Sequence, residues 1–247
     1  LVANGIAAES GVPFGGSAAS WIVEESDIRR ADLVIKATHD RIGPDRWVHG
    51  SVAEAVVSHS TVPVMLVRGS SAEHLALRFD TQNRLLLVPV DGSELAASAL
   101  PVARDLAQQL GASIVLVAVV PRPGQLAAAE SGVATQVGSE QARLEAEAWA
   151  YLEASVGQVG ASNVNVTTTL RRGEPALEIA AAAEEYAAAA TVMATHGRTG
   201  LVRSLVGSVA GAVLHHSSCP VVLHRPGVLR GAEQPIVRQP AIGVAGD

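Results

Sequence analysis

Apolar and polar positions alternate along this chain in short runs that predict strands and helices in turn. Residues 84–90 (RLLLVPV) and 113–120 (SIVLVAVV) are apolar runs with the length of buried strands. Between them, residues 94–111 place leucine, valine and alanine at helical spacing and end at Gly111. A strand, a helix and a second strand in this order predict the crossover unit of a parallel sheet.

The same alternation continues to residue 224. Helices are predicted over 140–156, 176–190 and 208–216, and strands over 164–170, 191–195 and 221–224. Residues 124–139 have no clear period and predict a loop. We therefore predict an α/β fold of the Rossmann-like type, an open and mainly parallel five-stranded sheet with helices on both faces.

An internal repeat indicates that the chain contains this unit twice. Residues 37–68 align with residues 194–225 without a gap, at a constant offset of 157, and 18 of the 32 positions are identical. The first copy lacks the first two strands and the first helix of the unit. Because residue 1 is not methionine, we expect the chain to be a fragment, and we expect the second copy or another chain to cover the open edge of the first copy.

The repeat and the composition of the intervening stretches divide the chain into four predicted segments. They are a partial unit over 1–68, a linker over 69–83, a complete unit over 84–226, and a tail over 227–247. The tail is rich in proline and glycine, so we expect it to be disordered.

Composition narrows the possible functions. The 247 residues are 48% hydrophobic and 17% charged, which is ample for packed cores. A net charge of −6 and only 3% aromatic residues argue against a nucleic-acid partner, and no apolar run is long enough to span a membrane. Cys219 is the only cysteine, so we expect a buried thiol in a cytoplasmic protein without an internal disulfide.

The candidate chemistry lies in a glycine-rich stretch over residues 191–208. A predicted strand ends near Met193, and Gly197, Gly200 and Gly207 follow before a helix starts at Ser208. Amides without a Cβ nearby, together with a helix N-terminus, can surround a phosphate. The alternative is that these glycines only form the turn between strand and helix.

Other polar features are predicted at the same edge of the sheet. Asp91, Val119, Gly173 and the glycine-rich loop all follow or end predicted strands, and open parallel sheets bind ligands at these carboxyl ends. Asp91 either binds a ligand or forms a turn before Gly92. Lys36 is the only lysine, so a Gly-Lys-Ser/Thr phosphate loop is absent.

At these residues the chain resembles the universal stress protein family in a tandem arrangement. The most specific piece is the motif G-x-x-G-x9-G-[ST], which is present as Ala194-Thr-His-Gly197, nine residues, and Gly207-Ser208. The V-P-V-D-G-S segment that contains Asp91, a G-E-P segment and the H-S-S-C-P-V-V-L run support it. The resemblance implies that the second copy binds ATP, with or without Mg²⁺, or a related adenine nucleotide.

The resemblance also implies a role for each matching position. Asp91 is expected to contact the ribose, Val119 to line the adenine pocket, and the loop to bind the phosphates. The loop positions of this predicted site are Ala194, His196, Gly197, Arg198, Gly200, Gly207, Ser208 and Val209. Ala194 departs from the motif, because its methyl group stands where the family has glycine and reduces the room for the nucleotide.

The first copy departs further from the motif. It has Ala37 at the first glycine position and Asp40 at the second, and a carboxylate repels phosphate. We therefore expect the first copy to bind no nucleotide and to act as the partner of the second copy in an intramolecular pseudo-dimer. A homo-oligomer is a further expectation.

Three functions remain open from the sequence. The first is regulatory nucleotide binding with at most slow ATP hydrolysis; the others are a nucleotide-independent interaction module and an adenylyl-transferring enzyme. No catalytic pair is evident, because His196 has no nucleophile or acid at a recognisable spacing. His215 and His216 are adjacent rather than four residues apart, so they predict no metal site.

Overall fold

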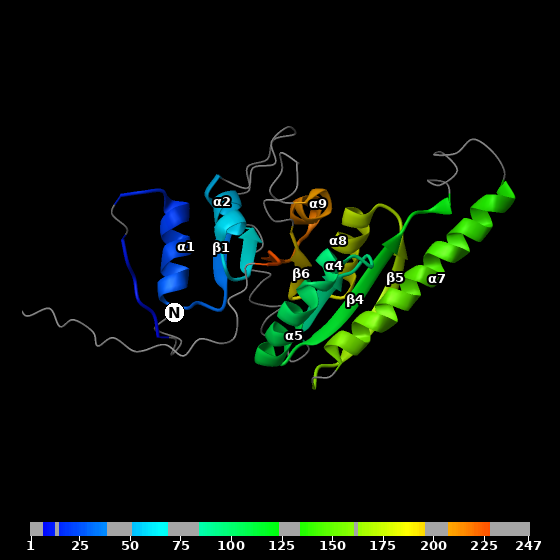
Figure 1. Cartoon of the computed structure of the whole chain (residues 1–247), viewed down its shortest axis with the longest axis horizontal. Coiled ribbons are helices and arrows are strands. Elements are labelled where there is room, and N and C mark those ends of the chain that lie inside the picture. The colour runs from blue at the N-terminus through cyan, green and yellow to red at the C-terminus, as the bar shows by residue number, and fades with distance from the viewer. Residues whose placement is uncertain are drawn as a thin grey trace, which may run out of the picture.

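The computed structural model describes residues 7–12, 15–38, 51–68, 84–123, 134–160, 163–195 and 207–227. Figure 1 shows helices and strands alternating along the chain. The helices are α1 (Ala18–Ile28), α2 (Ser51–His59), α4 (Glu94–Ala97), α5 (Ala99–Leu110), α7 (Ala134–Val159), α8 (Pro175–Glu185) and α9 (Ser208–His216). The strands are β1 (Val34–Thr38), β2 (Val64–Arg68), β3 (Leu85–Pro89), β4 (Ser113–Val120), β5 (Val166–Arg172), β6 (Ala190–Ala194) and β7 (Val221–His224).

The strands of both copies form one seven-stranded sheet, in the order β1-β2-β7-β6-β3-β4-β5. Every pair of neighbouring strands runs parallel except β2 and β7, which run antiparallel. The α/β fold with a mostly parallel sheet is thereby confirmed. The predicted linker over 69–83 and almost all of the predicted tail lie outside the described residues.

The junction between the copies is symmetric in its register. The paired residues are Val64 with Leu223, Met65 with Val222, and Leu66 with Val221. At the repeat offset of 157, Val64 corresponds to Val221 and Leu66 to Leu223. Exchanging the two copies therefore maps this pairing onto itself, with a pseudo-twofold axis at Met65 and Val222.

The second copy joins the first through β2, not through the open edge that was expected to be covered. Among the described strands β1 pairs only with β2 and ends the sheet. Ile35 in β1 is 64% exposed, whereas Val192, its counterpart in β6, is fully buried. The difference arises because α5 and β3 pack beside β6, and no described element takes their place beside β1.

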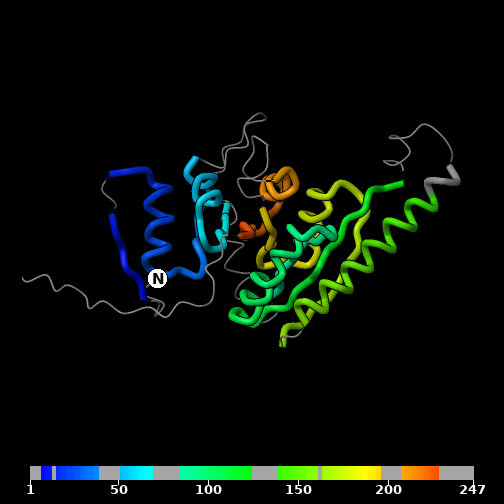
Figure 2. The backbone as a smooth tube through the Cα atoms, in the orientation of Figure 1, coloured from blue at the N-terminus to red at the C-terminus, as the bar shows by residue number. Residues whose placement is uncertain are grey.

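Different helices cover the two faces of the sheet, and one face has more of them than the other. One face is covered by α1, α2, α8 and α9, whose buried side chains share a core with Leu66, Leu87, Val117 and Leu223. The other face is covered by α5 and α7, which pack on Leu86, Val88, Leu116 and Val222. Figure 2 shows the first copy, in blue and cyan, at one end of this assembly and the rest of the sheet beyond it.

Two predicted helices differ from the structure for identifiable reasons. The stretch 94–111 forms two helices instead of one, because Pro101 has no N–H to donate to the carbonyl of Ala97. The helix predicted over 176–190 ends at Glu185, and Ala190 instead pairs with Leu86 in the sheet. Alanine favours helix, but burial between β3 and β7 decides the conformation at the end of this run.

The predicted loop over 124–139 is partly helical. Residues 134–139 belong to α7, while residues 124–133 lie outside the described residues. No helix in the described part of the chain combines the length and apolar character that crossing a membrane requires.

Candidate functional site

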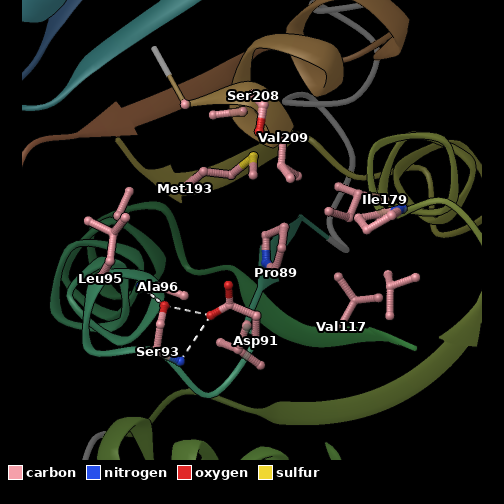
Figure 3. Close-up of a pocket in the computed structure, with 16 residues that line it drawn as sticks. Pro89, Asp91, Ser93, Leu95, Ala96, Val117, Ile179, Met193, Ser208 and Val209 are labelled. Atoms are coloured by element: carbon pink, nitrogen blue, oxygen red, sulfur yellow. Dashed lines mark hydrogen bonds between the residues drawn. The ribbon is translucent and has the colours of Figure 1, made fainter. Parts of the chain in front are cut away.

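A pocket of about 210 Å³ opens at the carboxyl ends of β3, β4 and β6. β4 and β5 lie on one side of β3, and β6 and β7 lie on the other, so the order in which strands are added reverses at β3. Open parallel sheets form ligand-binding crevices at such a reversal. The N-terminal turns of α4, α8 and α9 complete the wall (Figure 3).

Asp91, two residues after the end of β3, supplies a carboxylate to this pocket. Its Oδ1 accepts hydrogen bonds from the backbone N–H of Ser93 at 3.0 Å and from the Ser93 hydroxyl at 2.6 Å (Figure 3). The same hydroxyl accepts from the N–H of Ala96 at 3.1 Å and caps α4. The Asp91 side chain is exposed, and these hydrogen bonds hold its carboxylate in one orientation at the turn that starts α4.

Tyr151 of α7 packs against the outside of this turn. Gly92 has a φ of +80°, and a Cβ at Gly92 would lie 2.9 Å from Cδ1 of Tyr151. Burial, and after it the charges of Asp91 and Glu147, raise the pKa of the Tyr151 hydroxyl. A side chain at residue 92 would be strained by the positive φ and would press on the Tyr151 ring, so this position favours glycine.

Apolar side chains form the part of the pocket between the carboxylate and α9. They are Pro89 of β3, Val117 and Val119 of β4, Ile179 of α8, and Met193 of β6. Figure 3 shows Val117 and Ile179 on one side and Met193 on the other. An apolar slot with few polar groups at its ends is typical of sites that hold a flat organic ring.

The N-terminus of α9 forms the remaining wall. Ser208 and Val209 line the pocket, and the N-cap residue Gly207 provides no side-chain hydrogen bond to the first turn. In contrast, Ser93 caps α4, and Glu174 caps α8 by accepting from the N–H of Leu177 at 2.9 Å. No side chain in the described part of the chain caps the first-turn amides of α9, which point a partial positive charge toward the pocket.

Six of the ten predicted site residues lie around this one pocket. They are Asp91, Val119, Ala194, Gly207, Ser208 and Val209. Ala194 ends β6 and lines the pocket, and its side chain packs against the core on the α5 side of the sheet. The predicted His196, Gly197, Arg198 and Gly200 lie outside the described residues, as does Asp40 of the first copy. The ligand contacts of all ten remain predictions.

Most of the apolar lining of the pocket was not predicted from the sequence. Pro89, Val90, Ser93, Leu95, Ala96, Val117, Pro175, Ile179, Met193 and Ala210 also line the pocket. Val117 precedes Val119 by two residues in a strand, so both lie on the same face of the sheet. Ile179 follows Pro175 by one helical turn, which is the only sequence signal that connects those two positions.

The described lining of the pocket carries little charge. Among its described lining residues, Asp91 is the single ionisable one. The described part of the chain also holds no cluster of three or more histidine, cysteine, aspartate or glutamate residues that could bind a metal ion.

Comparison with known proteins decides the family. The model of the universal stress protein family matches residues 2–68 and 83–225. The chain belongs to the universal stress protein family. The two matched segments fall in the two copies of the repeat, so both copies are of this family's type.

Relatives of the family differ in how much of this chain they match. Universal stress protein MJ0531 of Methanocaldococcus jannaschii is 31% identical over 141 residues, which cover 56% of this chain and 79% of that protein. Universal stress protein Rv2005c of Mycobacterium tuberculosis is 27% identical over 201 residues, covering 79% of this chain. The chain spans 62% of the length of Rv2005c.

Solved structures of the family share the fold. A universal stress protein from Archaeoglobus fulgidus DSM 4304 matches with a TM-score of 0.61 and 24% identity, over 91% of this chain and 71% of that one. A putative universal stress protein from Pseudomonas aeruginosa matches with a TM-score of 0.58 over 86% of this chain and 69% of that one. These likenesses extend over both copies and confirm the Rossmann-like α/β architecture.

Proposed function

We propose that this universal stress protein binds an adenine nucleotide, with ATP as the expected ligand, in the pocket between β3, β4, β6 and α9. Binding would serve regulation rather than turnover. The observation that carries the proposal is the convergence of Asp91, Val119, Ala194 and Ser208 on one pocket, although they are spread over more than a hundred residues of sequence.

The pocket offers a matching group for each part of the nucleotide. The apolar slot with Val117 and Val119 suits the adenine ring, and the fixed Asp91 carboxylate suits the ribose hydroxyls. The first-turn amides of α9, which no described side chain caps, suit the phosphates. A Mg²⁺ ion would enter with the phosphates, and Arg198 is the expected additional phosphate ligand.

The first copy takes a structural role in this proposal. Its motif has Asp40 where the family has glycine, and its strand β2 pairs with β7 in a register that is symmetric about Met65 and Val222. We infer that the two copies form an intramolecular pseudo-dimer in which only the second copy binds nucleotide.

A charge placed at the start of α9 tests the proposal. Ser208→Asp adds a carboxylate to the first helical turn, where it favours the helix dipole but repels a phosphate. The matched control is Ser51→Asp, because Ser51 starts α2 at the equivalent position of the first copy and is also exposed. Both variants are made in the full chain and titrated with ATP by calorimetry.

We expect the wild-type chain and Ser51→Asp to bind one ATP with the same Kd. Ser208→Asp should raise Kd by about tenfold or more, with no loss of thermal stability. Saturating ATP should raise the Tm of the wild type, because a ligand that binds only the folded state stabilises it by mass action. No binding at millimolar ATP, or an unchanged Kd in Ser208→Asp, would contradict the proposal and favour a nucleotide-independent interaction module.

A further inference from the structure

Two arginines connect the copies in a reciprocal way. Arg68, the last residue of β2, donates from Nη2 to the carbonyl oxygen of His215 in the last turn of α9. Arg225, directly after β7, donates from Nη1 to the carbonyl oxygen of Ser58 in the last turn of α2. At the repeat offset of 157, Arg68 corresponds to Arg225, and Ser58 corresponds to His215. The same contact is therefore made twice across the pseudo-twofold axis.

The antiparallel junction explains why the arginines reach these positions. Helix α9 ends at His216 and β7 starts at Val221, so the start of β7 lies close to the end of α9. Antiparallel pairing directs the end of β2 toward the start of β7, which places Arg68 beside the last turn of α9. The last carbonyls of a helix lack partners within the helix and carry partial negative charge, so a guanidinium satisfies and stabilises them.

Helix α9 has one end in the pocket and the other end on Arg68. Gly207, Ser208 and Val209 line the pocket at its N-terminus, and His215 lies in its last turn. Nine helical residues span only about 13 Å, and a helix of this length moves as a stiff body. Holding the last turn of α9 in place therefore also fixes the direction of its first-turn amides.

We propose that Arg68 is a positioning residue for the pocket, through which the first copy supports ligand binding by the second. The proposal rests on the function proposed above. Arg68 does not line the pocket; it acts by fixing α9 through the His215 carbonyl. Arg225 makes the equivalent bond to α2, whose N-terminus belongs to the copy that carries Asp40, so its loss should not affect binding.

The pair of arginines provides a test with a matched control. Arg68→Met and Arg225→Met each remove one guanidinium and keep an apolar side chain, and both residues are half-buried in the full chain. We expect both variants to lower Tm by similar amounts. Arg68→Met should raise the Kd for ATP about fivefold or more, and Arg225→Met should leave it within about twofold of wild type. Arg68→Lys should recover part of the affinity, because an ammonium can still donate to the carbonyl.

An equal rise in Kd in both methionine variants, or no rise in Arg68→Met, would overturn the inference. Hydrogen exchange provides a second measurement that does not depend on nucleotide. The N–H of Gly211 donates to the carbonyl of Gly207 at 2.8 Å in the first turn of α9. Its exchange should be faster in Arg68→Met than in wild type and unchanged in Arg225→Met.

The two measurements separate this inference from the proposed function. If the wild type binds no ATP, the proposed function fails, and the exchange of the Gly211 amide still decides whether Arg68 positions α9. Unchanged exchange at Gly211 in Arg68→Met overturns the positioning role whether or not ATP binds.

Discussion

Replacing Gly92 by alanine should destabilise the protein through two separable effects. The first is conformational: Gly92 has a φ of +80°, and a left-handed backbone costs a residue with a Cβ about 1–2 kcal/mol. The second is steric, because the new Cβ would lie 2.9 Å from Cδ1 and 3.3 Å from Cε1 of Tyr151. Overpacking of this kind costs about 1–3 kcal/mol. The sum is a loss of about 2–5 kcal/mol in the free energy of unfolding.

Gly111→Ala is the matched control for the conformational effect. Gly111 ends α5 with a φ of +61°, and a Cβ at that position would have no atom of a described residue within 4 Å apart from its chain neighbours. This variant should therefore lose only about 1–2 kcal/mol. The difference between the two variants measures the contact with Tyr151 alone.

Urea unfolding followed by circular dichroism measures both losses. For a chain of this size each kcal/mol lowers Tm by about 2–4 °C, so thermal unfolding gives an independent value. Combining Gly92→Ala with Tyr151→Ala removes the steric contact, so the double variant should be more stable than the sum of the single losses predicts. Equal losses in Gly92→Ala and Gly111→Ala, or strict additivity with Tyr151→Ala, would refute the reasoning.

Three further variants test other features of the structure. Ser93→Ala removes the cap of α4 and should cost about 1 kcal/mol in urea unfolding; a loss below about 0.3 kcal/mol would show that water replaces the cap. A hydrogen bond from Arg172 lowers the pKa of Glu145 from 4.5 to about 2, so its contribution to stability is complete above pH 4.5 and is lost toward pH 2. Glu145→Gln should therefore have a lower urea midpoint than wild type at pH 7 and the same midpoint at pH 2, and a constant difference would contradict this. Burial lowers the pKa of His224, so the unfolded chain binds the proton more readily and wild type should lose stability as pH falls below about 6.5. His224→Leu should lose less over pH 7 to 5, and an identical pH profile would argue against a buried neutral imidazole.

Elements whose local signals agree could be predicted closely from the sequence. The strand at 113–120 and the helix at 208–216 have the predicted bounds, because an apolar run before a proline and a polar helix start after glycine are strong local signals. The alanine run after residue 176 was misjudged at its end. Alanine at 188–190 favours helix by itself, and only pairing with β3 and β7 makes Ala190 the start of a strand.

The candidate site was predictable where it depends on strand ends. Asp91 follows β3 by two residues and Ala194 ends the neighbouring parallel strand β6, so a pattern of strands and helices places them at one edge of the sheet. Ile179 and Met193 could not be assigned to the pocket, because their patterns are those of ordinary core residues. Which core residue faces a pocket depends on how α8 packs on the sheet.

The sequence by itself determined that the chain holds two copies of one α/β unit and that the first copy has lost the glycine replaced by Asp40. Both conclusions depend on comparing residues at a constant offset, which needs no coordinates. Only the tertiary structure decided that the copies meet at β2 and β7. It also decided that Arg68 of the first copy binds the last turn of α9 and that Arg225 of the second copy binds the last turn of α2. The physical reason is that each copy has two edge strands, β1 and β2 in the first copy and β5 and β7 in the second, and either edge offers N–H and C=O groups that can pair with another strand. Local patterns do not distinguish those edges, and the packing of the whole chain selects one.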